Sequence, residues 1–214
     1  MGTDRVTERM ESAFREAYRT NAWGDPESIS GPGSGVARTA AFRDEIPPLL
    51  RDLRATSLLD VGCGDFNWMR LVELPVERYL GVDIVPELVE QSRRRHADRK
   101  HAFMLADFTR AELPRMDVIL CRDCLVHFAF ADVRAALGNF ARSGARWLLT
   151  TTFIDRQREN VDMETGGWRP LNLQLPPFDF PAPERMIDER CLHSGGIYVD
   201  KRLALWRLDR LAIS

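Results

Sequence analysis

The sequence lacks any apolar run near the ~18 residues that a membrane-spanning helix requires, and its first residues lack the apolar segment of a signal peptide. It also lacks an excess of either charge: 30 Lys and Arg residues against 32 Asp and Glu residues give a formal net charge of -2. Such a chain shows no electrostatic footprint for nucleic acid or for an anionic membrane. We therefore expect a cytoplasmic protein that binds neither nucleic acid nor membranes.

Cysteine is scarce as well, and the 4 cysteines of the 214-residue chain are set in apolar runs. They are too few for a disulfide framework. Cys121 and Cys124 have the CxxC spacing that suits zinc or redox chemistry, but a second pair of ligands is missing. We expect no metal site.

A short apolar run, Leu58 to Val61, ends abruptly in Gly62-Cys63-Gly64, the pattern of a buried strand that enters a tight turn. Two glycines one residue apart let the backbone approach a ligand, and a following helix would present unpaired N–H groups to it. Asp83, 19 residues after Gly64, ends a second apolar run, where a carboxylate can accept hydrogen bonds from both hydroxyls of a ribose. A bare glycine turn is the alternative, but the pairing with Asp83 favours a nucleotide-type pocket.

The third glycine of the dinucleotide fingerprint is absent, because Phe66 and Asn67 occupy its region, so a ligand without a pyrophosphate fits better. The motif Asp60-Val-Gly62-Cys-Gly64 resembles the first motif of the class I S-adenosylmethionine-dependent methyltransferases. That resemblance implies S-adenosyl-L-methionine as cofactor. The residues that we expect to bind it are Asp60, Gly62, Gly64, Asp83, Ile84, Asp107, Phe108 and Arg122.

Asp107 and Phe108 follow a third predicted strand. A carboxylate that accepts from an exocyclic amine, next to an aromatic ring that covers a base, would form an adenine site. A helix cap beside a core aromatic is the alternative, and the joint presence of Asp60, Gly62 and Asp83 favours the adenine site.

Strand and helix patterns alternate along the chain without a repeat, which predicts an α/β protein with a doubly wound, mostly parallel sheet and helices on both faces. The resemblance implies a Rossmann-like methyltransferase fold with seven strands and an antiparallel terminal strand. Residues 1–56 are expected to form an N-terminal helical cap with a lid loop rich in glycine and serine, although a linker remains an alternative for that loop. Residues 57–214 would then bind the cofactor. Helices are expected at 7–18, 36–45, 66–72, 86–96 and 132–142 with Asp132 as a cap, a short turn at 49–53, and strands at 58–61, 79–82, 102–105, 117–121, 146–153, 185–190 and 201–208.

His127 lies six residues after the fourth predicted strand, where this methyltransferase class often carries a residue that faces the methyl group. An imidazole with a pKa near 6.5 suits general-base chemistry at neutral pH, whereas a structural histidine bonded to a carbonyl is the alternative. Asp123 is a second candidate base. Arg122 can pair with Asp123 or bind a substrate carboxylate in two-point fashion.

The segment 154–183 is too long for an ordinary loop and too apolar for a disordered tail, so we expect it to fold over the pocket as a substrate loop. Its candidate acceptor-binding residues are Asn160, Trp168, Arg169 and Asn172. We expect a methyltransferase that acts on a small-molecule or peptide acceptor, with O-methylation favoured. The alternatives are a nicotinamide-dependent oxidoreductase and a non-catalytic binding module.

Overall fold

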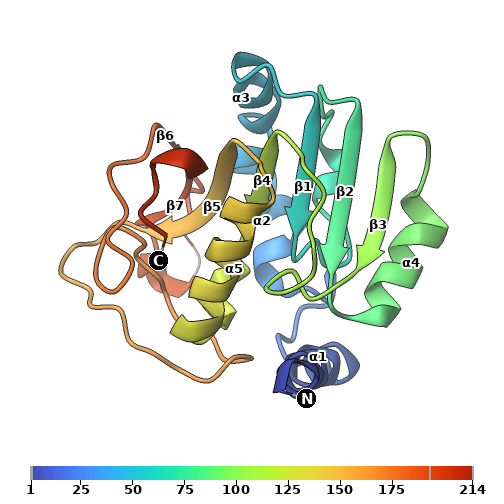
Figure 1. Ribbon diagram of the computed structural model, residues 1–214, viewed down its shortest axis with the longest axis horizontal. Coiled ribbons are helices and arrows are strands. Elements are labelled where there is room, and N and C mark those ends of the chain that lie inside the picture. Colours follow the sequence, from blue (N-terminus) through green and yellow to red (C-terminus); the bar gives the residue numbers. More distant parts are fainter. Residues whose placement is uncertain (1, 193, 214) are drawn as a thin grey trace.

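The computed structural model describes residues 2–192 and 194–213, and its centre is one seven-stranded sheet (Figure 1). The strands are β1 (Ser57–Val61), β2 (Arg78–Asp83), β3 (His101–Leu105), β4 (Val118–Cys121), β5 (Trp147–Phe153), β6 (Arg185–Asp188) and β7 (Lys201–Arg207). Their order across the sheet is β3-β2-β1-β4-β5-β7-β6. The first five strands are parallel, and β7 is antiparallel to both β5 and β6. The predicted fold class is confirmed.

Strand order reverses beside β1, because the chain proceeds outward through β2 and β3 and then returns to place β4 on the other side of β1. Leu59 pairs with Leu80 on one side and with Ile119 on the other. In open parallel sheets, ligands bind outside the carboxyl ends of the strands at such a switch point. Asp83 is the last residue of β2 and Cys121 is the last residue of β4, the two strands that flank β1.

The helices are α1 (Gly2–Thr20), α2 (Val36–Arg43), α3 (Ile46–Asp52), α4 (Pro86–His96) and α5 (Phe130–Arg142). Helix α5 covers one face of the sheet (Figure 1). Helices α2 and α3 cover the other face, where Val89 of α4 packs with Phe103 of β3. Alternate strand residues serve the two faces, since Leu59 packs with Phe140 of α5 whereas Leu58 packs with Phe42 of α2. Helix α1 instead lies across the end of the sheet to which β1, β2 and β3 point (Figure 1).

Three local predictions were wrong. The segment 66–72 contains only a single 3₁₀ turn, Met69–Leu71, because Phe66 adopts a left-handed backbone with φ of 59° that no α-helix can continue. The turn expected at 49–53 belongs to α3, which tolerates two prolines because they occupy its first turn, where N–H groups have no helical acceptor. Asp132 does not cap α5; Ala129 holds the cap position, and the Asp132 carboxylate accepts from the hydroxyl of Thr165, 2.5 Å away.

Between β5 and β6, residues 154–184 form neither helix nor strand, yet they pack into the protein. Leu171 and Leu173 are fully buried in the core cluster on the α5 side of the sheet. The connection between β6 and β7 contains the 3₁₀ turn Ser194–Gly196.

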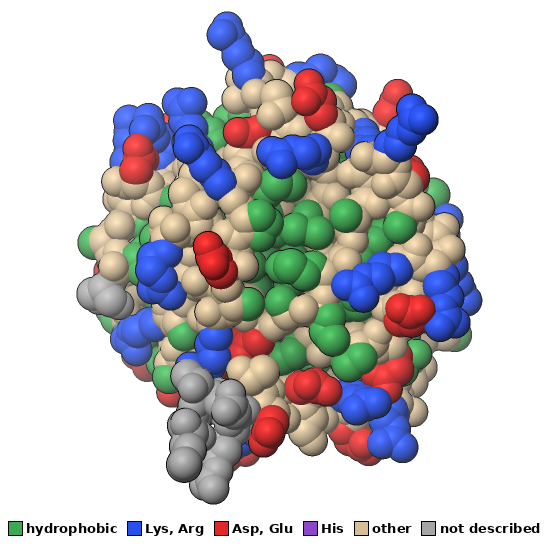
Figure 2. Space-filling model, turned by 45° about the vertical axis from the view of Figure 1, so that its right-hand side comes forward, with side chains coloured by type: hydrophobic (Ala, Val, Ile, Leu, Met, Phe, Trp, Pro, Cys, Tyr) green, Lys and Arg blue, Asp and Glu red, His purple; other side chains and the backbone are tan. Residues whose placement is uncertain are grey.

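The described part of the chain contains no helix that is both long and apolar enough to cross a membrane. On the face shown in Figure 2, acidic and basic side chains are interspersed around a central group of hydrophobic side chains. This agrees with the near-neutral formal charge of -2.

Candidate functional site

A cavity lies at the carboxyl ends of the central strands, between the sheet and α1. It encloses about 680 Å³ with its open mouth included, a size typical of small-ligand sites. We call it the first cavity. Its lining consists of Phe14, Tyr18, Trp23, Ile29, Ser30, Ser34, Gly62, Gly64, Asp83, Ile84, Val85, Leu88, Phe108, Arg122, Asp123, Cys124, His127 and Phe128.

The glycine turn after β1 lines this cavity in a backbone shape that side chains rarely adopt. Gly62 and Gly64 have φ angles of 71° and 57°, in the left-handed region that favours glycine. The Gly62 N–H and the Cys63 N–H both donate to the carbonyl of Val82, at 2.8 Å and 3.1 Å, which ties the turn to β2. A β-carbon on Gly62 would come within 2.5 Å of the Cys124 sulfur. Glycine is therefore required at these positions for two reasons: the turn geometry, and the close approach of the backbone to neighbouring side chains.

Asp83 presents a carboxylate to the first cavity from the end of β2. Its Oδ2 accepts from the N–H of Gly64 at 2.9 Å, and its Oδ1 accepts from the N–H of Val85 at 3.0 Å. Burial raises the pKa of Asp83, and these N–H bonds oppose the rise. Each carboxylate oxygen has a second lone-pair site, so Asp83 can still accept from a ligand hydroxyl.

Asp60 does not reach the cavity, contrary to its predicted role in direct cofactor binding. Its carboxylate is 4% exposed and accepts from the phenol of Tyr79 at 2.6 Å, on the α2 side of the sheet. Burial raises the pKa of Asp60 to about 7, against the lowering effect of the Tyr79 bond. Asp60 therefore makes a buried contact between β1 and β2.

Asp107 also lies outside the lining, whereas its neighbour Phe108 is part of it. Its Oδ1 accepts from the N–H and the hydroxyl of Thr109 at 2.9 and 2.6 Å. Its Oδ2 accepts from the hydroxyl of Thr7 in α1 at 2.7 Å. The Asp107 carboxylate thus holds its own turn and the N-terminal helix α1. This is close to the helix-cap alternative considered for Asp107 from the sequence.

The loop at 28–35 is held against the glycine turn by Asp65. The Asp65 carboxylate accepts from the hydroxyls of Ser28 and Ser30 at 2.8 and 3.1 Å and from the N–H of Ile29 at 3.1 Å. The Asp65 N–H donates in return to the Ser30 hydroxyl at 3.0 Å. The loop therefore closes one side of the first cavity and does not act as a linker.

Four charged side chains form a buried network beside the cavity: Arg122, Asp123, Glu189 and Lys201. Arg122 donates to Glu189 at 2.7 Å and to the carbonyl of Gly33 at 2.6 Å, so it fastens the 28–35 loop. Burial alone would raise the pKa of Asp123, but the adjacent charges of Lys201 and Arg122 outweigh it and hold that pKa well below its usual range. Asp123 is therefore an ion-pair partner and a poor base.

His127 lies on the wall of the same cavity, in the 3₁₀ turn Leu125–His127. Its Nδ1 is 2.7 Å from the carbonyl of Gly167, and because a carbonyl only accepts, Nδ1 must carry the proton. Burial lowers the pKa of His127, against the raising effect of that bond. The neutral ring thus keeps a free lone pair on Nε2.

A second cavity adjoins the first and shares four of its lining residues: Trp23, Ser30, Asp123 and His127. We call it the second cavity; with its open mouth it encloses about 920 Å³. Its remaining lining residues are Gly31, Pro32, Gly33, Arg38, Phe153, Trp168, Cys191, Tyr198 and Lys201. Of the acceptor-binding residues predicted from the 154–183 segment, only Trp168 lines it.

The other three predicted acceptor residues are structural. The Arg169 guanidinium donates to the carbonyls of Val161, Leu125, Val126 and Phe128, so every nitrogen already has an acceptor. Asn160 donates to the carbonyls of Asn172 and Pro176 at 2.8 Å, and Asn172 is 2% exposed. These side chains satisfy the buried backbone of a long segment that lacks secondary structure.

Sequence reasoning missed the aromatic residues of the N-terminal segment and the contribution of β7. Trp23 lines both cavities, and a tryptophan beside a glycine-rich loop is a usable sequence signal for a ligand wall. Lys201 lies in an apolar strand pattern, where a buried lysine requires an ionic partner; that requirement could have flagged it. The hydrophobic periodicity of the sequence does not indicate which carboxylate pairs with Lys201.

Among residues 2–192 and 194–213, no group of three or more His, Cys, Asp or Glu side chains is placed to hold a metal ion. Cys121 and Cys124 are free thiols. Burial contributes to raising the pKa of Cys124, after the larger effect of its bond with Cys121, and keeps it a protonated thiol.

A family model described as a methyltransferase domain matches residues 58–145. A comparison with curated protein sequences finds no match. Among solved structures, magnesium protoporphyrin IX methyltransferase from Synechocystis PCC 6803 with bound S-adenosylmethionine is similar with a TM-score of 0.58 and 14% identity, over 92% of this chain and 96% of that chain. The amino pentose methyltransferase CalS10 from Micromonospora echinaspora has a TM-score of 0.50 and 19% identity, over 62% of this chain and 61% of that chain. Similarities at this identity show a shared fold.

Proposed function

We propose that the chain is a class I S-adenosylmethionine-dependent methyltransferase whose first cavity binds the cofactor and whose second cavity binds the methyl acceptor. The observation that carries this assignment is the shared wall: His127 and Asp123 line both cavities. Because these residues border both cavities, a cofactor in the first cavity and an acceptor in the second would lie next to each other. Methyl transfer requires that proximity.

The first cavity fits an adenosyl ligand by its chemistry. The Asp83 carboxylate would accept from ribose hydroxyls, as predicted, and Gly62 and Gly64 leave room for close approach of the ligand to the backbone. Ile84, Leu88 and Phe108 supply apolar surface for a purine ring. Asp60 and Asp107 are assigned no direct contact with the cofactor.

When bound, the cofactor supplies a methyl group on a positively charged sulfur, and the sulfur leaves as a neutral thioether. The protein has to align the acceptor and, for a hydroxyl, to remove its proton. We assign that proton to Nε2 of His127, because the bond from Nδ1 to Gly167 fixes the ring with Nε2 as acceptor. Arg122 would act by holding the 28–35 loop in place.

We propose O-methylation of a small molecule as the reaction. A His127 ring kept neutral at physiological pH would serve no purpose for an acceptor already ionised, such as a carboxylate. The second cavity is bounded by residues 23–38, 153–168 and 191–201 and suits a compact ligand better than an extended peptide. In the proposed division, residues 1–56 provide the cap and lid, and residues 57–214 bind the cofactor.

Calorimetric titration with S-adenosylhomocysteine and, separately, with NAD tests the proposal. We expect saturable 1:1 binding of S-adenosylhomocysteine and none of NAD, because Asn67 stands where the dinucleotide fingerprint has its third glycine. Tighter binding of NAD would support an oxidoreductase instead. A folded protein that binds neither compound would be a non-catalytic module.

A further inference from the structure

We propose that the second cavity accepts a flat aromatic compound that carries a hydroxyl group and no positive charge. This inference rests on the proposed function, since it identifies the acceptor class of that site. It is carried by three independent features of the cavity: its rings, its charges and its base.

Two groups of aromatic rings line the second cavity. In the first, ring centroids are 5.0 Å apart for Trp168 and Tyr198, 5.8 Å for Phe153 and Tyr198, and 6.2 Å for Phe153 and Trp168, all edge-to-face. In the second, the rings of Trp23 and His127 are 5.4 Å apart. Rings in such mutual contact keep their orientation, and a flat aromatic ligand can gain stacking or edge contacts from both groups.

The aromatic wall is also unusually open to solvent. Trp168, which lines the cavity, is 42% exposed. An exposed aromatic side chain in a cavity wall offers apolar surface that a ligand can cover. An apolar ligand face would cover the exposed ring of Trp168.

The charges of the cavity disfavour a cationic ligand. The ionisable side chains among its lining residues, besides His127, Cys191 and Tyr198, are Arg38, Asp123 and Lys201. Asp123 is the one carboxylate of this group, and it is paired with Lys201 and with Arg122 at 3.3 Å. Aromatic rings attract a cation, and a nearby positive charge opposes that attraction. Here the carboxylate is compensated and Arg38 adds a positive charge, which leaves neutral or anionic ligands.

The base selects an acidic hydroxyl. Burial lowers the pKa of His127, which makes Nε2 a weak proton acceptor. A phenol, with a pKa of about 10 as in tyrosine, loses its proton to such a base far more readily than an aliphatic alcohol does. An aromatic ring in the acceptor therefore serves two purposes. It contacts the aromatic side chains of the cavity, and it makes the attached hydroxyl acidic enough to lose its proton to His127.

Three probes of similar size test the inference on the protein saturated with S-adenosylhomocysteine. They are 2-naphthol, decahydro-2-naphthol, which lacks the aromatic faces, and 2-(aminomethyl)naphthalene, which is a cation at neutral pH. By calorimetry we expect 2-naphthol to bind at least tenfold more tightly than either of the others. Equal binding of the saturated alcohol, or tighter binding of the cation, would overturn the inference. Absence of S-adenosylhomocysteine binding in the first step would instead overturn the proposed function.

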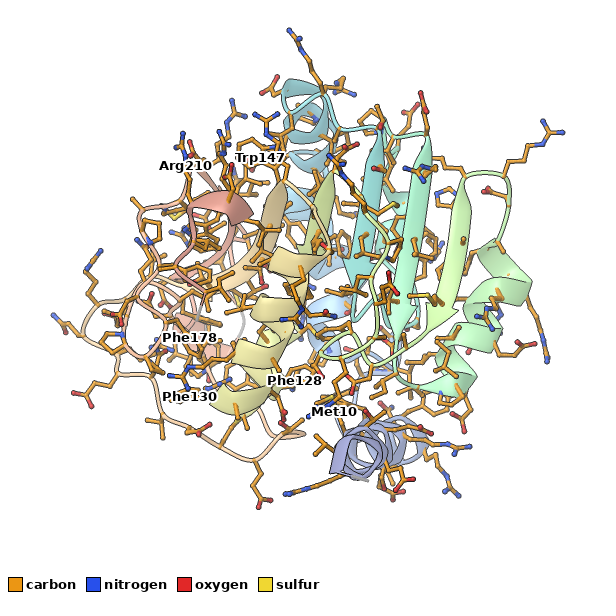
Figure 3. All side chains as sticks on the ribbon, viewed as in Figure 1. Met10, Phe128, Phe130, Trp147, Phe178 and Arg210 are labelled. Carbon is orange, nitrogen blue, oxygen red and sulfur yellow. The ribbon has the colours of Figure 1, made fainter. Side chains whose placement is uncertain are left out.

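Two variants check which wall is responsible. Trp168→Leu keeps apolar volume but removes the ring, and we expect it to weaken 2-naphthol binding at least tenfold while S-adenosylhomocysteine binding stays within twofold. Tyr198→Leu should act in the same direction. The matched control is Trp147→Leu at the opposite end of β5, away from Phe128 and the cavities, which should change neither affinity (Figure 3). Unchanged 2-naphthol binding in both Trp168→Leu and Tyr198→Leu would refute the assignment.

Discussion

Ser30 and Gly64 share one small volume: the hydroxyl of Ser30 occupies the place where a β-carbon on Gly64 would lie. The two residues are far apart in the chain, yet both line the first cavity. Gly64 is thus required by the 28–35 loop that packs against it.

Gly64→Ala should therefore loosen the lid. The added methyl group would displace Ser30, and alanine at a φ of 57° costs roughly 1 kcal/mol or more. We expect the dissociation constant of S-adenosylhomocysteine to rise at least tenfold. The control is Gly138→Ala in α5, where a β-carbon meets only the end of the flexible Arg142 side chain. Alanine there should leave binding unchanged and stabilise the helix by up to about 1 kcal/mol. Equal binding by the Gly64→Ala and Gly138→Ala proteins would show that the lid does not depend on this contact.

Asp83→Ala should weaken binding of S-adenosylhomocysteine by about 2 to 4 kcal/mol, since two charge-assisted hydrogen bonds to a ribose would be lost. Asp107→Ala is the matched comparison, because both carboxylates are 7% exposed and follow neighbouring strands, but only Asp83 lines the cavity. We expect the Asp107 variant to lose far less affinity in calorimetry. A loss equal to that of Asp83→Ala would restore the predicted adenine contact of Asp107.

His127→Ala should lower kcat for methyl transfer to 2-naphthol by roughly 100- to 10,000-fold, the usual contribution of a general base. S-adenosylhomocysteine affinity should change little. In the parent protein the unprotonated ring is the active form, so kcat/KM should fall as pH drops through the lowered pKa of His127, below 6.5, and stay level above it. Rate profiles between pH 5 and 8 measure this. The same acidic limb in His127→Ala would assign the proton to another group.

Asp123→Asn provides the comparison for that experiment. Its pKa lies well below the usual range, so Asp123 stays ionised throughout the pH interval and cannot produce the acidic limb. Replacing it leaves Lys201 with Glu189 as its remaining partner, 3.2 Å away, and should reduce stability. We expect the pH profile of kcat/KM to keep its shape in this variant.

Asp60→Asn should change the pH dependence of stability. The pKa of Asp60 is about 7 in the folded protein and near 3.8 when unfolded, so the folded state holds a proton that the unfolded state has released. The free energy of unfolding should consequently fall as pH rises from about 4 to 7, by an amount on the order of 4 kcal/mol, and level off above that. Asparagine can still accept from Tyr79 but does not titrate. Denaturant unfolding at several pH values should show a flatter curve for the variant, and parallel curves would contradict the assigned pKa.

The sequence alone determined the features that depend on local pattern. The alternation of strands and helices, the glycine turn after β1 and the placement of Asp83 follow from hydrophobic periodicity and from the chain geometry that only glycine permits. These signals lie within a few residues of the structure that they specify. The strands at 185–188 and 201–207 were also predicted, whereas their antiparallel arrangement followed from the resemblance to the methyltransferase family.

Only the tertiary structure decided which polar side chains reach the cavities. Asp60, Asp83 and Asp107 look alike in sequence, as carboxylates in or just after a strand, but Asp60 turns to Tyr79 and Asp107 to Thr7, 100 positions away in the chain. The adjacent residues Trp168 and Arg169 diverge in the same way, one to the second cavity and the other to buried carbonyls. The role of a polar group is set by the partner that satisfies it, and in this fold those partners come from distant segments, beyond the reach of any local pattern.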